Sequence, residues 1–213
     1  MRERWATFDC YGTLIDWDGG IRRVLATVFG EERADEQLAR YHDVERTLEA
    51  DGSRSYRQVM TDAMRGLGAE GEAEKLADSL PSWTPFPEVR GALMETRGHG
   101  WKLAILSNTD RDLIEASMRQ IGVPFEVAIV ASEIGSYKPV HAHWLRFFDE
   151  TAASQDHHVH VAQSHFHDIV PATELRLRTI WINRRGETGD PPPTRELRDL
   201  SKLPETLDEL VPA

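Results

Sequence analysis

Residues that can carry out covalent chemistry occur at four well separated places in the chain. The first is Asp9, which follows an apolar run at residues 6–8 and precedes Gly12. A carboxylate held at the end of a buried strand can act as a nucleophile, because it forms an acyl-type ester that water releases in a second step. Gly12 allows the backbone to turn sharply at this point. Asp9 is therefore the candidate nucleophile.

The other three places supply groups that would support Asp9. Ser107 and Asn108 offer hydroxyl and amide donors, and Asp168 adds a second carboxyl group. Lys138 offers a positive charge, which we expect to keep Asp9 ionised and to lower its pKa. Each group alone also fits a plainer role, because aspartate and serine often cap helices and most lysines are solvated. Four such groups in order favour a catalytic site.

The elements that must position these groups follow an alternating pattern. Short apolar runs alternate with stretches whose apolar residues are spaced by three and four, which is typical of βαβ units around a parallel sheet. Ligands of such sheets bind beyond the carboxyl ends of the strands, where the four places lie. We therefore predict an α/β fold, a Rossmann-like parallel sheet with helices on both faces. The predicted strands are residues 6–8, 103–106, 127–130, 159–162 and 179–182.

Residues 17–85 depart from this alternation. Helical patterns fill the segment without a convincing strand, at residues 21–29, 35–50, 56–67 and 72–80. The proline-rich stretch 81–87 closes it. We predict that residues 17–85 form a small helical cap domain inserted after the first strand, and that residues 1–16 and 86–213 form the α/β core domain.

Composition and charge narrow the class of protein. The chain has 213 residues, of which 40% are hydrophobic and 29% charged, so we expect a folded globular protein. A net charge of −11 argues against nucleic acid as a partner. Neither a secretory signal nor a run of the roughly 18 apolar residues that span a membrane is seen. The single cysteine, Cys10, has no disulfide partner in the chain, and we expect a cytoplasmic protein with no membrane partner.

Together the four motifs resemble those of the haloacid dehalogenase superfamily, over nearly the whole chain. Residues 8–14 (Phe-Asp-Cys-Tyr-Gly-Thr-Leu) look like its nucleophile loop, residues 106–108 (Leu-Ser-Asn) like its second motif, and residues 137–139 (Tyr-Lys-Pro) like its third. Asp168 matches the acid of its fourth motif, and residues 17–85 are similar to its small helical cap. The resemblance implies a hydrolase with Asp9 as nucleophile, and it makes a homodimer possible.

Tyr11 distinguishes two branches of this superfamily. Its phosphatases carry a second aspartate two residues after the nucleophile, where this chain has Tyr11. A phenol with a reference pKa of about 10 is a poor proton donor and base near neutrality. The string Asp-x-Tyr-Gly-Thr-Leu instead resembles the L-2-haloacid dehalogenase branch, where halide leaves without a proton. That branch implies no cofactor and no metal, whereas the phosphatase alternative implies Mg²⁺ bound by Asp9 and Asp168.

The dehalogenase resemblance assigns roles to further residues. It implies that Arg40, on the predicted helix 35–50, binds the carboxylate of a small organic acid and the departing halide, although an ordinary exposed helix arginine fits equally well. An apolar pocket that excludes water is expected around the reacting carbon. The residues expected to line it are Tyr11, Tyr41, Val44 and His165.

The same resemblance implies a two-step mechanism. Asp9 attacks the halogen-bearing carbon with inversion, and water oriented by Lys138 and Asp168 hydrolyses the ester. The groups expected to hold the carboxylates are Thr13, Ser107 and Asn108. Two alternatives stay open, namely a Mg²⁺-dependent small-molecule phosphatase and a noncatalytic small-molecule-binding protein with the same fold.

Overall fold

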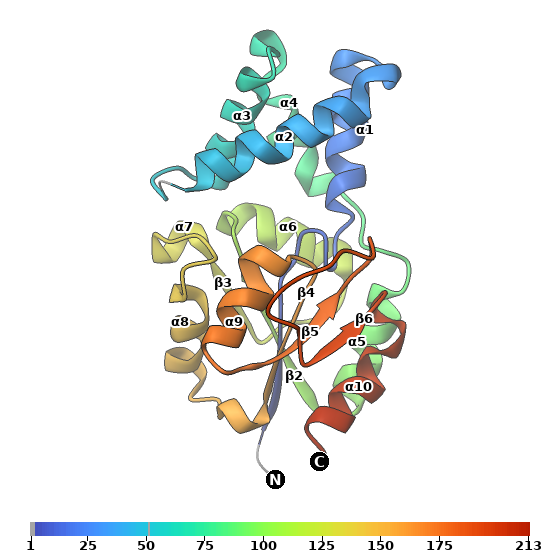
Figure 1. Ribbon diagram of the computed structural model, residues 1–213, viewed down its shortest axis with the longest axis vertical. Coiled ribbons are helices and arrows are strands. Elements are labelled where there is room, and N and C mark those ends of the chain that lie inside the picture. Colours follow the sequence, from blue (N-terminus) through green and yellow to red (C-terminus); the bar gives the residue numbers. More distant parts are fainter. Residues whose placement is uncertain (1–2, 51) are drawn as a thin grey trace.

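The computed structural model describes residues 3–50 and 52–213 and has two layers of different construction. One layer is a six-stranded sheet in which every strand pairs parallel with its neighbours. The other consists of helices that stand beyond the carboxyl ends of the strands (Figure 1). The predicted α/β fold with a parallel sheet is confirmed.

The sheet has the strand order β3-β2-β1-β4-β5-β6, with the first strand near its centre. All five predicted strands are present. The sixth was not predicted, because its exposed and polar side chains give no apolar signal at the sheet edge. The strands are β1 Arg4–Phe8, β2 Trp101–Ser107, β3 Val127–Val130, β4 His158–Ala162, β5 Arg178–Ile182 and β6 Arg195–Leu197.

Helices cover both faces of the sheet, as the sequence predicts. Successive side chains of a strand point to opposite faces, so Phe8 packs into the larger hydrophobic core and Trp5 into a separate one. The larger core takes in α5 (Val89–Gly98), α6 (Arg111–Ile121) and α10 (Leu203–Leu210), and the other takes in α8 (Ala142–Thr151) and α9 (Val170–Glu174). The short helix α7 (Ala131–Ile134) follows β3 directly.

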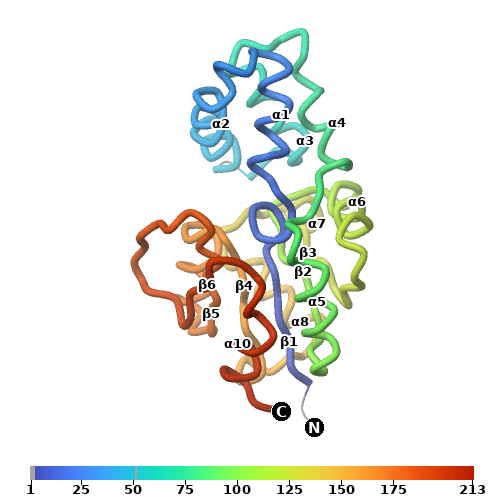
Figure 2. The backbone as a smooth tube through the Cα atoms, turned by 90° about the vertical axis from the view of Figure 1, so that its right-hand side faces the viewer, coloured from blue at the N-terminus to red at the C-terminus, as the bar shows by residue number. Residues whose placement is uncertain are grey.

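The second layer, which we call the cap, contains α1 (Trp17–Phe29), α2 (Ala34–Glu49), α3 (Tyr56–Gly66) and α4 (Lys75–Ser79). These helices stand apart from the sheet in both views (Figures 1 and 2). The two segments that join cap and sheet run side by side, since the Asp16 backbone N–H donates to the Thr84 carbonyl at 3.0 Å. Within the ranges described, no helix combines the length and the apolar character needed to cross a membrane.

Candidate active site

Three of the predicted groups meet at the carboxyl edge of the sheet. The Lys138 ammonium donates to Asp9 Oδ1 at 2.9 Å, to Asp168 Oδ1 at 2.7 Å and to the Leu106 carbonyl at 2.9 Å. Asp9 directly follows β1, Leu106 belongs to β2, and Asp168 lies in the π-helical turn after β4. All three N–H groups of this buried lysine are therefore used inside the protein.

Two further predicted residues hold this arrangement in place. The Thr13 hydroxyl donates to Asp9 Oδ2 at 2.7 Å and accepts from the Gln163 backbone N–H at 2.8 Å. The Asn108 side chain accepts from the Lys138 backbone N–H at 2.6 Å and donates to the Lys138 carbonyl at 3.1 Å. Thr13 thus holds the Asp9 carboxyl group, and Asn108 fixes the lysine loop and also hydrogen-bonds to the Glu49 carboxyl group.

The two carboxyl groups beside Lys138 ionise differently. Although burial opposes ionisation, the charge of Lys138 and the hydrogen bond from His160 lower the pKa of Asp168 to about 2. Burial raises the pKa of Asp9, and repulsion from Asp168 raises it further. Together they outweigh the attraction of Lys138, which lowers it. The predicted lowering of the Asp9 pKa was wrong, because one ammonium shared by two carboxylates cannot fully compensate both.

A buried polar chain behind the sheet edge was missed by the sequence reasoning. His160 Nε2 lies 3.0 Å from Asp168 Oδ1, and the Thr7 hydroxyl lies 2.8 Å from both His160 Nδ1 and His158 Nε2. The alternation of His158 and His160 along one strand was the available signal, since it places both on one face. This series of hydrogen-bonded side chains fixes the orientation of Asp168.

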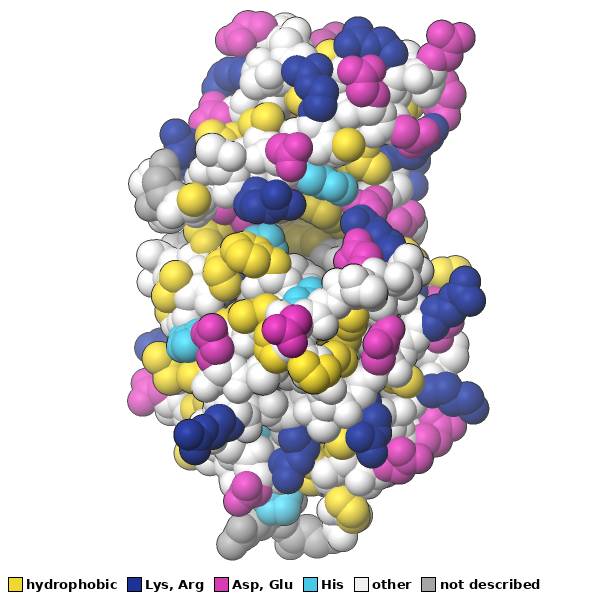
Figure 3. Space-filling model, in the orientation of Figure 1, with side chains coloured by type: hydrophobic (Ala, Val, Ile, Leu, Met, Phe, Trp, Pro, Cys, Tyr) yellow, Lys and Arg dark blue, Asp and Glu magenta, His cyan; other side chains and the backbone are white. Residues whose placement is uncertain are grey.

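A cavity of about 350 Å³ opens above these groups, between the cap and the sheet. On the face drawn in Figure 3 the surface is hollowed between the two layers. The core side of the cavity includes Asp9, Tyr11, Ser107, Lys138, His165, His167 and Asp168. The cap side includes Trp17, His42, Glu45, Arg46, Glu49 and Tyr56.

Two predicted pocket residues line this cavity. The Tyr11 ring stacks near Tyr56 with ring centroids 6.0 Å apart, and its hydroxyl lies 3.1 Å from Ser117 Oγ. Burial raises the pKa of the Tyr11 phenol, so it stays protonated near neutrality. His165 Nε2 lies 2.9 Å from the Pro191 carbonyl oxygen.

The three residues predicted on α2 do not line the cavity. Arg40 is exposed and donates to Gln37 Oε1 at 3.1 Å, Tyr41 is buried within the cap, and Val44 packs against Gly66 of α3. The reason is helical rotation, because residues three and four apart share a face. The face of α2 that lines the cavity carries His42, Glu45, Arg46 and Glu49.

The sequence reasoning missed the two glutamates of that face. The hydroxyls of Tyr41 and Tyr56 donate to Glu45 Oε1 at 3.0 and 2.9 Å. Burial outweighs these hydrogen bonds and raises the pKa of Glu45 to about 7. Burial and the charge of Glu45 raise the pKa of Glu49 well above its usual range. The four-residue spacing of Tyr41, Glu45 and Glu49 was the only sequence signal.

Comparison with known proteins identifies the family. The family model of haloacid dehalogenase-like hydrolases matches residues 6–182. The chain belongs to this family. The (S)-2-haloacid dehalogenase of Pseudomonas sp. (strain YL) is 30% identical over 194 residues, which cover 84% of this hydrolase and 82% of that relative.

Two further proteins resemble the hydrolase. Haloacetate dehalogenase H-2 of Moraxella sp. (strain B) is 33% identical over 123 residues, which cover 57% of this chain and only 54% of that protein. The L-2-haloacid dehalogenase of Xanthobacter autotrophicus, solved with chloropropionic acid covalently bound, superposes with a TM-score of 0.83 at 18% identity, over 96% of this chain and 98% of that chain. The latter likeness confirms the fold.

The carboxyl groups of the hydrolase do not fit the Mg²⁺ site of the phosphatase alternative. Asp9 uses Oδ1 for Lys138 and Oδ2 for Thr13, and Asp168 uses Oδ1 for Lys138 and His160. Mg²⁺ requires a near-octahedral set of oxygens. Over the ranges described, only Asp168 Oδ2 of these four oxygens lacks a partner. The comparisons do not support the Mg²⁺ alternative either.

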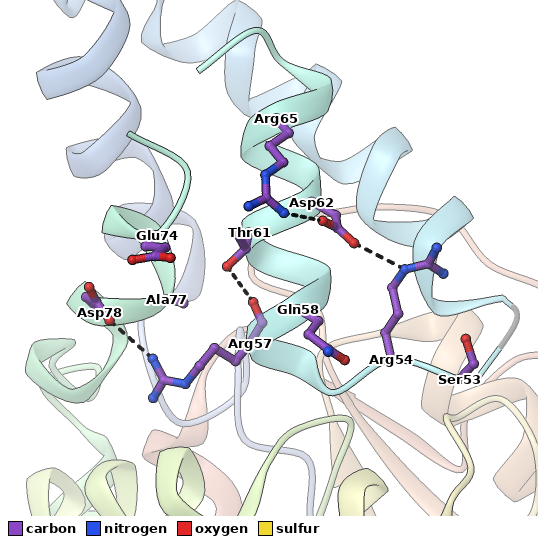
Figure 4. A pocket seen from close by; sticks show the side chains of 10 residues that line it. All are labelled: Ser53, Arg54, Arg57, Gln58, Thr61, Asp62, Arg65, Glu74, Ala77 and Asp78. Carbon is purple, nitrogen blue, oxygen red and sulfur yellow. Dashed lines mark hydrogen bonds and ion pairs between the residues drawn. The ribbon is translucent and has the colours of Figure 1, made fainter. Parts of the chain in front are cut away.

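A larger hollow of about 660 Å³ lies on the outside of the cap of the hydrolase. Its arginines pair with Asp62 and Asp78 of the same hollow (Figure 4). Arg65 lies 2.9 Å and Arg54 3.3 Å from the Asp62 carboxylate, and Arg57 lies 3.3 Å from Asp78. Asp9, Lys138 and Asp168 do not line this hollow, so we do not assign the reaction to it.

Proposed function

We propose that this hydrolase removes halide from a small L-2-haloacid by attack of Asp9 on the halogen-bearing carbon. The observation that carries the proposal is the Asp9 carboxylate, which faces the cavity while Thr13 and Lys138 hold its two oxygens. Tyr11 stands where a phosphatase needs an acid and base, and a buried phenol does not serve there. The named activities of the relatives support the same chemistry.

In the first step an Asp9 oxygen forms a bond to carbon, and the carbon–halogen bond breaks with its electron pair on the halide. In the second step water attacks the carbonyl carbon of the ester and regenerates Asp9. Asp168 Oδ2 has no partner in the described part of the chain and lines the cavity, so we assign it to orient this water. The sum of both steps is haloacid plus water giving hydroxy acid, halide and a proton.

We assign the substrate carboxylate to the Ser107 hydroxyl. Ser107 lines the cavity, is fully buried, and its Oγ has no hydrogen-bond partner among the described residues. Lys138 cannot supply a further donor, because its three N–H groups are engaged. A free buried hydroxyl donor facing a cavity suits a carboxylate oxygen.

We also assign residues 17–85 as a cap domain and residues 1–16 and 86–213 as the core domain. The paired connecting segments near Asp16 and Thr84 coincide with these boundaries. The cap then supplies one wall of the cavity and excludes water from the reacting carbon.

The test is halide release from each enantiomer of 2-chloropropionate, with and without EDTA. We expect release from the L enantiomer that EDTA does not affect. Asp9→Asn should lower kcat by at least about a thousandfold while thermal unfolding is unchanged, because an amide is a poor nucleophile. Undiminished turnover in this variant would contradict the proposal.

A single turnover in ¹⁸O-water, with enzyme in excess, tests the ester directly. The product hydroxyl should carry ¹⁶O from Asp9, and mass spectrometry should find ¹⁸O in the peptide that contains Asp9. Label found in the product instead would show direct attack by water. Release of phosphate from a phosphate ester, with no halide release, would assign Asp9 to phosphatase chemistry.

A further inference from the structure

The carboxyl groups of Glu45 and Glu49 lie at the cavity but have no role in the reaction proposed above. We propose that protonated Glu49 donates a hydrogen bond to the departing halide, with Glu45 as its positioning residue, and that the preferred substrates are therefore fluorinated acids. This inference rests on the proposed function and deepens it. The halide site is thus provided by a neutral acid rather than by the cation expected at Arg40.

The position of Glu49 suits this role. Glu45 and Glu49 are one helical turn apart on the face of α2 that lines the cavity, and each is less than 10% exposed. Two tyrosine hydroxyls hold Glu45 in place, and the Glu49 carboxyl lies 3.6 Å from His167 Nε2 across the cavity. Displacement at carbon expels the halide on the side opposite Asp9, and the cap is the wall opposite the sheet edge (Figure 1).

The surroundings of Glu49 favour its protonated form. The charges that act on Glu49 are those of Glu45 on α2 and of Asp9 and Lys138 on the core side, and the Asn108 side chain hydrogen-bonds to it. The other charged or titratable groups at the cavity include His42, Arg46, Asp168, Arg185 and Glu187. Lys138 is already shared by two carboxylates, and Arg46 has a side chain that is 61% exposed and pairs with Asp43.

His167 offers no charge either, because burial lowers its pKa to about 4. An ionised Glu49 would thus be a further uncompensated buried charge, which is costly. Burial accordingly raises the pKa of Glu49 well above its usual range, which favours the O–H form.

The chemistry of the halides determines which substrate gains from such a donor. As the carbon–halogen bond breaks, the electron pair stays on the halide, and Glu49 keeps its proton because hydrogen fluoride is a stronger acid than a buried carboxyl group. Fluoride carries its charge on the smallest ion and is the poorest leaving group, so a hydrogen bond to a full charge assists it most. Bromide leaves readily and gains little.

The decisive experiment compares Glu49→Met and Glu49→Gln with the wild type on L-2-fluoropropionate and L-2-bromopropionate. We expect Glu49→Met to lower kcat for fluoride release about a hundredfold and for bromide release only a few fold. Glu49→Gln keeps an N–H donor and should retain most of the fluoride rate. Glu36→Met is the matched control, since Glu36 lies on the same helix, is exposed and does not line the cavity.

Two further measurements separate a catalytic role from a structural one. Fluoride release by the wild type should fall at alkaline pH as Glu49 loses its proton, and Glu49→Gln should lack this loss. Binding of sodium fluoride to the resting protein, followed by ¹⁹F NMR, should weaken at least tenfold in Glu49→Met.

Equal losses for fluoride and bromide release, or unchanged fluoride binding in Glu49→Met, would overturn the role of Glu49. Absence of any halide release by the wild type would instead overturn the proposed function. Fluoride binding needs no turnover, so it tests Glu49 in either case.

Discussion

The two walls of the cavity are built in different ways. The core wall brings together groups from the ends of three strands and the loops that follow them, and its charges are joined through one buried ammonium, that of Lys138. The cap wall takes its acids from a single helix, α2, where tyrosine hydroxyls hold Glu45. In the core wall the carboxyl groups are paired with a cation, whereas in the cap wall burial raises the pKa values of Glu45 and Glu49.

This difference separates two tasks. A network of paired charges is rigid, because losing any member leaves a buried charge without a partner. A protonated acid on a helix is neutral, and a substitution changes what it donates without unpairing a charge. The core wall therefore suits the proposed attack by Asp9, and the cap wall suits the proposed selection of the leaving halide.

The largest expected effect comes from breaking the core wall. Lys138→Met should lower the free energy of unfolding by about 3–5 kcal/mol and abolish halide release, because Asp9 and Asp168 lose their shared cation. Urea unfolding measures the change. Lys102→Met, which removes an exposed ion pair, should cost less than about 1 kcal/mol. Similar losses of stability in both variants would contradict the claim that the shared cation of the core wall contributes more than an exposed ion pair.

A second substitution tests whether the cap wall keeps its protons. The pKa of Glu45 is raised from 4.5 to about 7, so its contribution to stability is fully present below pH 4.5 and is lost as the pH rises through 7. Glu45→Gln should remove this dependence, and its stability relative to the wild type should rise by about 3 kcal/mol between pH 4.5 and pH 8. Urea unfolding at both pH values gives the free energy of unfolding of each protein. If the two proteins change in parallel with pH, the pKa of Glu45 is not raised in the folded protein.

A smaller effect is expected at the substrate carboxylate. Ser107→Ala should raise KM for L-2-chloropropionate about tenfold with little change in kcat, since one hydrogen bond from a hydroxyl to the substrate carboxylate is lost. Steady-state halide release measures both constants. The exposed Ser201→Ala is the control. A fall in kcat at constant KM would move Ser107 from binding to the chemical step.

The smallest effect is expected on the outer face of the cap. Arg40→Ala should change kcat/KM by less than about twofold, because an exposed surface residue outside the cavity contributes little. Arg46→Ala, at the cavity, is the matched comparison and should raise KM more than Arg40→Ala does. A strong effect confined to Arg40→Ala would mean that α2 rotates about its own axis when the substrate binds.

The amino-acid sequence by itself determined the sheet and the core wall. Apolar runs located the four interior strands and the edge strand β3, and motif residues at strand ends had to meet because parallel strands finish at one edge. Asp9, Thr13, Lys138 and Asp168 are therefore neighbours despite their separation in the chain. The exposed strand β6 was missed because it buries nothing that a hydrophobic pattern could reveal.

Only the tertiary structure decided the cap wall and the balance of charge. The sequence predicts that α2 is a helix, but its rotation about its own axis depends on packing against α1 and α3, so Glu45 and Glu49 rather than Arg40 line the cavity. Likewise, pKa values depend on burial and on how many carboxylates share Lys138. These are properties of three-dimensional packing, which residue types and spacing do not specify.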